Sequence, residues 1–164
     1  MTTRIEEDME LRGQVRCLDL KANDGCIEND HVAAVAGIEA SKLEHEHRAG
    51  WANESGTTAV AEAHVIHVVR GLTGTVKSFA TGVVVACLLG ATVTVDLLKN
   101  GVSILDAAIV LDNGDAAYDI VEGVIDTAAV VHDDVLEVVV TVAAGGGTIG
   151  EGVFAALDLF EDVE

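Results

Sequence analysis

The chain has 164 residues and a formal net charge of −19, and half of its residues are hydrophobic although only 3% are aromatic. This length suits one domain with an appendage, and the apolar half is enough for a real core. Nine cationic residues cannot form a basic stripe for phosphate groups, so the composition argues against nucleic-acid binding.

The longest apolar run, Gly82–Gly90, is about half as long as a membrane-spanning helix, so no membrane partner is expected. The acidic, polar start MTTRIEEDME does not have the pattern of a secretory signal, and we expect a protein that is used without secretion. The three cysteines, Cys17, Cys26 and Cys87, have no metal-type spacing and are expected to be reduced, with a Cys17–Cys26 bridge as the alternative.

Residues 1–57 are expected to form an N-terminal arm with little regular structure or a short helix. Ala, Glu, Lys and Leu favour helix between residues 31 and 56, but Gly37 interrupts the pattern and the apolar spacing is poor. Ile38, Leu43 and Trp51 are isolated apolar residues of this arm. We expect these three side chains to bind in pockets of a partner, so the arm would be the attachment segment, with packing of the arm on the sandwich of its own chain as the alternative.

Residues 58–164 show the alternation of a half-buried strand many times over, which predicts an all-β antiparallel sandwich or jelly roll of about seven or eight strands. The clearest case is Ala91–Leu105, where Val93, Val95 and Leu97 alternate with polar residues and Asn100-Gly101 predicts a type I′ hairpin turn. The expected strands are Ala59–Arg70, Val76–Leu89, Ala91–Lys99, Val102–Leu111, Ala117–Asp126, Val135–Ala143 and Gly152–Phe160.

The histidines offer the most tempting metal motif. His45 and His47 would share one face of a strand, but the spacing supplies no third ligand, so we interpret His45-Glu46-His47 as a solvated charged stretch. His64 and His67 are three residues apart and would point to opposite faces of a regular strand. No metal site and no cofactor are therefore expected.

The remaining polar clusters are interpreted as turns. Asp112-Asn113-Gly114-Asp115 lacks the distal Glu of a calcium loop, Gly145-Gly146-Gly147 lacks the Lys of a phosphate loop, and His132-Asp133-Asp134 precedes a strand. No Ser, Cys or His stands in the sequence context of a catalytic triad. We therefore expect no catalytic residue, and a protein that is not an enzyme.

Three blocks of the sandwich carry a family resemblance: TVTVDLLKNGVSILDAAIVLD, AAYDIVEGVID and VHDDVLEVVVTVAAGGGTIGEGVFAALDLFED. Together they resemble the C-terminal β-sandwich of head decoration, or cement, proteins of tailed bacteriophages. The resemblance spans Ala59–Asp162 and departs from the family pattern at Asp133-Asp134, where related strands usually have Gly-Asp. It implies a virion structural protein, made in the host cytoplasm, that binds the major capsid protein on the outer capsid surface and assembles as a homotrimer.

Two other classes of function stay open. A phage fibre or tail-associated sandwich would bind host glycans, but Trp51 and Tyr118 are the only Trp and Tyr in the chain. A metal-dependent enzyme on a jelly-roll scaffold would need three ligands to converge from among His45, His47, His64 and His67. The acidity of the sandwich is interpreted as a means of solubility, with uptake of divalent cations as the alternative.

Overall fold

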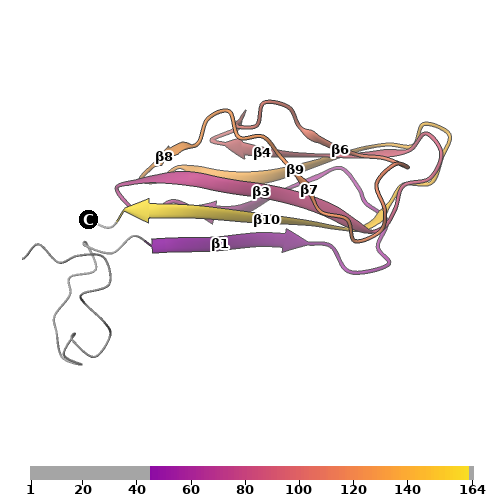
Figure 1. Cartoon of the computed structure of the whole chain (residues 1–164), viewed down its shortest axis with the longest axis horizontal. Coiled ribbons are helices and arrows are strands. Elements are labelled where there is room, and N and C mark those ends of the chain that lie inside the picture. The colour runs from indigo at the N-terminus through magenta and orange to yellow at the C-terminus, as the bar shows by residue number, and fades with distance from the viewer. Residues whose placement is uncertain (1–44, 163–164) are drawn as a thin grey trace, which may run out of the picture. The chain divides into compact units, whose positions relative to one another are not determined.

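The computed structural model describes residues 45–162, which form two antiparallel sheets packed face to face (Figure 1). The all-β sandwich predicted from the sequence is thus confirmed. The first sheet contains β1 (His45–Ala52), β10 (Glu151–Asp162), β3 (Thr73–Val85), β7 (Val121–Glu122) and β8 (Ala129–Val131). The second sheet contains β2 (Glu62–Val68), β9 (Val135–Ala143), β4 (Thr92–Lys99), β5 (Val102–Ser103) and β6 (Ile109–Leu111).

Most of the core comes from the inward-facing residues of the four long central strands, and the connections and short strands beside them supply the rest. On β4, Val93, Val95 and Leu97 are fully buried, while the residues between them are only partly covered. The same alternation places aliphatic side chains of β9 and β10 between the sheets. Small branched side chains suit a sandwich because they fill a thin space between two pleated surfaces.

The turn between β4 and β5 has the predicted type I′ geometry. Asn100 and Gly101 have φ angles of 51° and 82°, as a tight turn between strands of right-handed twist requires. The Asn100 side chain also binds outside the hairpin, since its Oδ1 accepts a hydrogen bond from the Val135 amide at 2.9 Å. The turn therefore fixes β9 as well as its own two strands.

Residues N-terminal to the expected boundary at Thr58 already belong to the sandwich. All eight residues of β1 pair in antiparallel register with β10, from His45 opposite Glu161 to Ala52 opposite Phe154. Residues 45–52, which we assigned to the arm, are therefore an edge strand. An edge strand has a neighbour on one side only and tolerates polar residues on both faces, so β1 lacks the apolar alternation that revealed the central strands.

Two segments that were expected as single strands are broken by contacts between the sheets. Val102–Leu111 is interrupted after Ser103, and Leu105 forms a bridge with Ile125. Ala117–Asp126 contains only the two-residue strand β7, because this segment crosses from β3 towards the second sheet. The short strand β8, which pairs with the start of β3, was not predicted.

Candidate functional site

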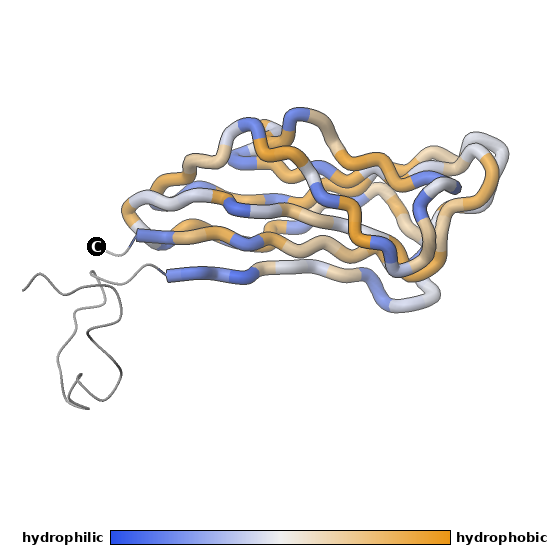
Figure 2. Tube along the Cα trace, viewed as in Figure 1, coloured by the Kyte–Doolittle hydropathy of each residue, from blue (hydrophilic) through white to orange (hydrophobic). Residues whose placement is uncertain are grey.

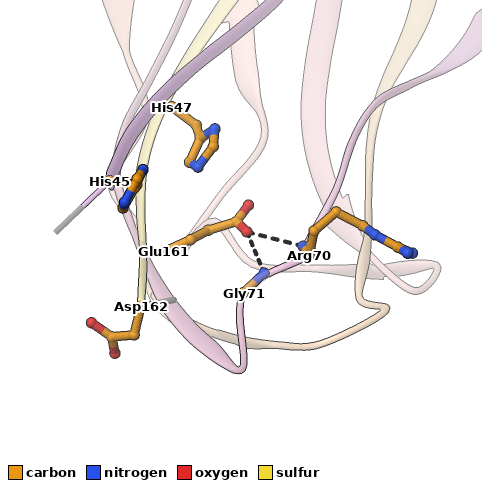
Figure 3. Close-up of a pocket in the computed structure, with 6 residues that line it drawn as sticks. All are labelled: His45, His47, Arg70, Gly71, Glu161 and Asp162. Carbon is orange, nitrogen blue, oxygen red and sulfur yellow. Dashed lines mark hydrogen bonds between the residues drawn. The ribbon is translucent and has the colours of Figure 1, made fainter. Parts of the chain in front are cut away.

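A small pocket lies at the end of the sandwich where β1 begins and β10 ends (Figure 3). Its volume is about 200 Å³, and the turn between β2 and β3 forms one wall. The residues that line it are His45, His47, Arg70, Gly71, Glu161 and Asp162. They come from three separate parts of the chain, so the fold alone brings them together.

Glu161 is the central residue of this pocket, and its side chain is 4% exposed. Its Oε2 accepts hydrogen bonds from the amides of Arg70 at 2.9 Å and Gly71 at 2.6 Å (Figure 3). Its Oε1 accepts a hydrogen bond from His67 Nε2 on β2. Burial by itself would raise the pKa of Glu161, but the bonds from His67, Gly71 and Arg70 outweigh this effect and hold the pKa below its ordinary value.

Both oxygens of the Glu161 carboxylate thus accept hydrogen bonds from other groups of the same chain. Glu161 belongs to the first sheet, whereas His67 belongs to the second, so the contact between them ties the two sheets together at their open end. The Arg70 and Gly71 amides would otherwise be unpaired in a tight turn, which is costly for buried groups. The arrangement supports a structural role for the carboxylate.

The expectation that His64 and His67 point to opposite faces is wrong. The pairing of β2 with β9 shifts by one residue between Val65 and His67, and this bulge changes the phase of the strand. Both histidines consequently face the first sheet. The His64 ring stacks on Trp51 of β1 at a centroid distance of 4.4 Å, and His67 contacts Glu161 of β10.

The bulge also brings His67 close to the histidines of β1. The rings of His45 and His47 are stacked with their centroids 6.4 Å apart, and those of His47 and His67 are 5.6 Å apart. His45 and His47 thus share one face of a strand, as expected, but they line a pocket rather than a solvated stretch. Within residues 45–162, no three His, Cys, Asp or Glu side chains are arranged to hold a metal ion.

Of the three expected partner-binding residues, Trp51 alone lies within the described part of the chain. It is partly buried, packs against the core and stacks on His64. A stacked, partly buried indole is a poor platform for a sugar ring. Ile38 and Leu43 lie outside the described residues, as do Cys17 and Cys26. Cys87 is a buried free thiol.

The other polar clusters form turns. Asp112 Oδ1 accepts a hydrogen bond from the Gly114 amide at 2.6 Å, which closes the loop after β6 around its own backbone. In the turn before β9, Asp133 has a φ angle of 68°. Next to it, Asp134 is 7% exposed and accepts hydrogen bonds from the Asn100 side chain and the Val131 amide.

Sequence reasoning missed Glu161 and Arg70, and no local signal could have found them. Glu161 lies 90 residues from Gly71 along the chain, and its partners become visible only when β10 is placed beside β3.

No helix long and apolar enough to cross a membrane is found among residues 45–162.

No protein-family model and no curated protein matches the chain. Among solved structures, the capsid asymmetric unit of cyanophage Pam1 is similar, with 13% identity and a TM-score of 0.48 over 72% of this chain and 84% of that chain. A structure of infectious bursal disease virus strain Gt has 10% identity and a TM-score of 0.33 over 75% of this chain and 37% of that chain. Both structures come from viruses, and the similarity is limited to the general course of the backbone.

Proposed function

We propose that this chain is a virion structural protein that binds the outer surface of a capsid as a decoration, or cement, protein. The observation that carries the proposal is the sequence resemblance of Ala59–Asp162 to the sandwich domain of such proteins in tailed phages. The two-sheet fold agrees with that resemblance. A rigid sandwich with an aliphatic core suits a protein whose task is to hold its shape on a shell.

We also propose that the protein has no catalytic role. The main support is that the pocket at the β1–β10 end is built around Glu161, whose two oxygens already bind His67 and the amides of the β2–β3 turn. A general base or a metal ligand needs an oxygen that is available to the reacting group. Glu161 would have to give up the contacts that hold the turn before it could act.

The partners of this function are the major capsid protein and further copies of the chain, which we propose form a homotrimer. Three copies that bind a threefold site together multiply weak single contacts through their high effective concentration. The formal charge of −19 keeps many copies apart in solution before they bind.

The test combines sedimentation of the full-length protein with binding to undecorated heads of the virus that encodes it. We expect a trimer in solution, saturable binding to heads, and greater resistance of the decorated heads to heating. A protein that binds isolated host glycans but does not bind heads would instead favour the fibre or tail-associated class. A protein that binds neither heads nor glycans would contradict both the decoration function and the fibre or tail-associated class.

A further inference from the structure

The end of the sandwich opposite the Glu161 pocket exposes a group of large apolar side chains. This end lies on the right in Figure 1, where β3 leads into β4 and β9 leads into β10, and much of its trace is hydrophobic in Figure 2. We call it the apolar end and define it by Val85, Leu88, Leu89, Tyr118 and Ile120. Leu89 is 75% exposed and Tyr118 is 70% exposed.

Residues from two separate segments lie at the apolar end. Leu88 and Leu89 lie in the connection between β3 and β4, directly beyond Val85. The Tyr118 amide donates a hydrogen bond to the Val83 carbonyl at 2.8 Å, which places Tyr118 and Ile120 beside the end of β3. The fold therefore places exposed apolar side chains that are far apart in sequence at the same end of the sandwich, and exposed apolar patches can mark binding sites.

Two of these side chains are held in an unfavourable backbone conformation. Leu89 has a φ angle of 58° and Tyr118 one of 66°, a region that bulky L-residues avoid and glycine adopts readily. Both side chains are exposed, so packing inside the chain does not offset the strain. Strained residues of this kind concentrate at sites of function.

The connection that presents Leu89 is held rigidly by the glycine-rich segment after β9. Leu88 and Thr148 exchange backbone hydrogen bonds of 2.9 and 3.2 Å. A Cβ atom on Gly145 would lie 1.8 Å from the Gly90 carbonyl oxygen, so only glycine permits this approach of the two backbones. A pre-formed loop loses little conformational entropy on binding, which favours affinity.

The charges at the apolar end have one sign. Five carboxylates, Glu54, Asp112, Asp115, Asp119 and Glu151, lie in the loops or strand ends on this side of the sandwich. The cationic residues within 45–162 lie towards the other end. Arg48 contacts Asp158, Arg70 lies in the β2–β3 turn, Lys77 lies over the Phe160 ring, and Lys99 ends β4.

We propose that the apolar end docks on a protein surface of the shell that is apolar at its centre and basic at its rim. This inference rests on the proposed function and names the part of the chain that makes the contact. A second copy of the same end is the wrong occupant, because the carboxylates of the two copies would repel each other.

The test uses the full-length double variant Leu89→Gly/Tyr118→Gly and the binding of undecorated heads. Glycine relieves the positive φ at both positions, so we expect a Tm equal to or above that of the wild type. Removal of the two exposed anchors should weaken head binding by about tenfold or more. The matched control is Val102→Thr, a 69% exposed apolar residue at the far end, which should bind as the wild type does.

Two further measurements complete the test. If the glycine variant unfolds, the double variant Leu89→Asn/Tyr118→Asn takes its place in the binding measurement, because asparagine also tolerates positive φ. Binding of the wild type should weaken as NaCl is raised, and Glu54→Gln/Asp119→Asn should reduce that salt dependence.

The outcomes separate this inference from the proposed function. If the wild type binds heads and both double variants bind equally well, the docking surface is wrong while the decoration function stands. If the variants turn a trimer into a monomer, the apolar end is a contact between copies and the proposal is wrong. If the wild type does not bind heads, the decoration function fails and this inference fails with it.

Discussion

Glu161 is the residue on which the open end of the sandwich depends most. Its carboxylate accepts hydrogen bonds from the Arg70 and Gly71 amides and from His67, and it is buried in the process. We predict that Glu161→Gln lowers the free energy of unfolding by about 2 kcal/mol, because hydrogen bonds to a charged acceptor are replaced by weaker ones to a neutral amide. Chemical denaturation at neutral pH measures this loss.

The pKa of Glu161 predicts how this loss depends on pH. The pKa is lower in the folded protein than in the unfolded chain, where it is about 4.3. The carboxylate therefore adds stability that is fully present above the unfolded pKa and disappears as pH falls through the folded pKa. The stability difference between the wild type and Glu161→Gln should shrink as pH is lowered from about 7 to about 3. Glu54→Gln, at an exposed loop position, is the control for the loss of one carboxylate and should change the free energy of unfolding at neutral pH much less than Glu161→Gln does.

Asp133 has a φ angle of 68°, which lies in the region that favours glycine. We predict that Asp133→Gly raises the free energy of unfolding by about 0.5 kcal/mol, since the strain outweighs the exposed ion pair with Arg70. Asp133→Ala keeps the strain, loses the ion pair and should be less stable than the wild type in the same thermal unfolding experiment. A glycine variant less stable than the alanine variant would contradict this assignment.

At the scale of elements, β1 limits how far the chain can be shortened from its N-terminus without loss of stability. β1 covers one edge of β10, and its Trp51 side chain packs on the core. A chain that begins at Thr57 exposes the edge of β10 and leaves His64 without its ring partner. We predict that this chain unfolds at a lower temperature than the wild type and tends to aggregate, because an uncovered long strand can pair with other chains.

A chain that begins at His45 is the matched comparison. It keeps the whole of β1 and its pairing with β10, so its Tm should stay close to that of the full-length protein. Loss of head binding by this shorter chain would assign the attachment to residues before His45. Equal Tm values for the two shortened chains would show that β1 adds nothing to the stability of the sandwich.

At the scale of the whole molecule, repulsion between negative charges is the dominant long-range interaction. A formal charge of −19 on 164 residues favours unfolding, because the charges are closer together in the folded state. We predict that the Tm rises by several degrees as NaCl is raised from about 0.05 M to about 1 M, since salt screens repulsion between exposed carboxylates. A Tm that falls or stays constant would show that ion pairs, and not repulsion, dominate the surface.

The local pattern was sufficient wherever a strand has a neighbour on each side and buries one face. Val93, Val95 and Leu97 alternate because one face of β4 is buried, and the Asn100-Gly101 turn could be read directly because positive φ selects those residues. β9 has the predicted bounds, Val135–Ala143, for the same reason. The fold class therefore follows from composition and period.

Only the tertiary structure decided what happens at the edges and ends. β1 is polar because it has one neighbour, and the bulge after Val65 turns His67 towards Glu161, a contact between residues 94 positions apart. The exposed, strained positions of Leu89 and Tyr118 depend on the glycine-rich segment and on β3 beside them. Hydrophobic periodicity shows which face of a strand is buried, but it does not show which distant segment covers the edge of that strand. The Glu161 pocket and the apolar end are built from contacts between distant segments, so the sequence pattern alone could not predict them.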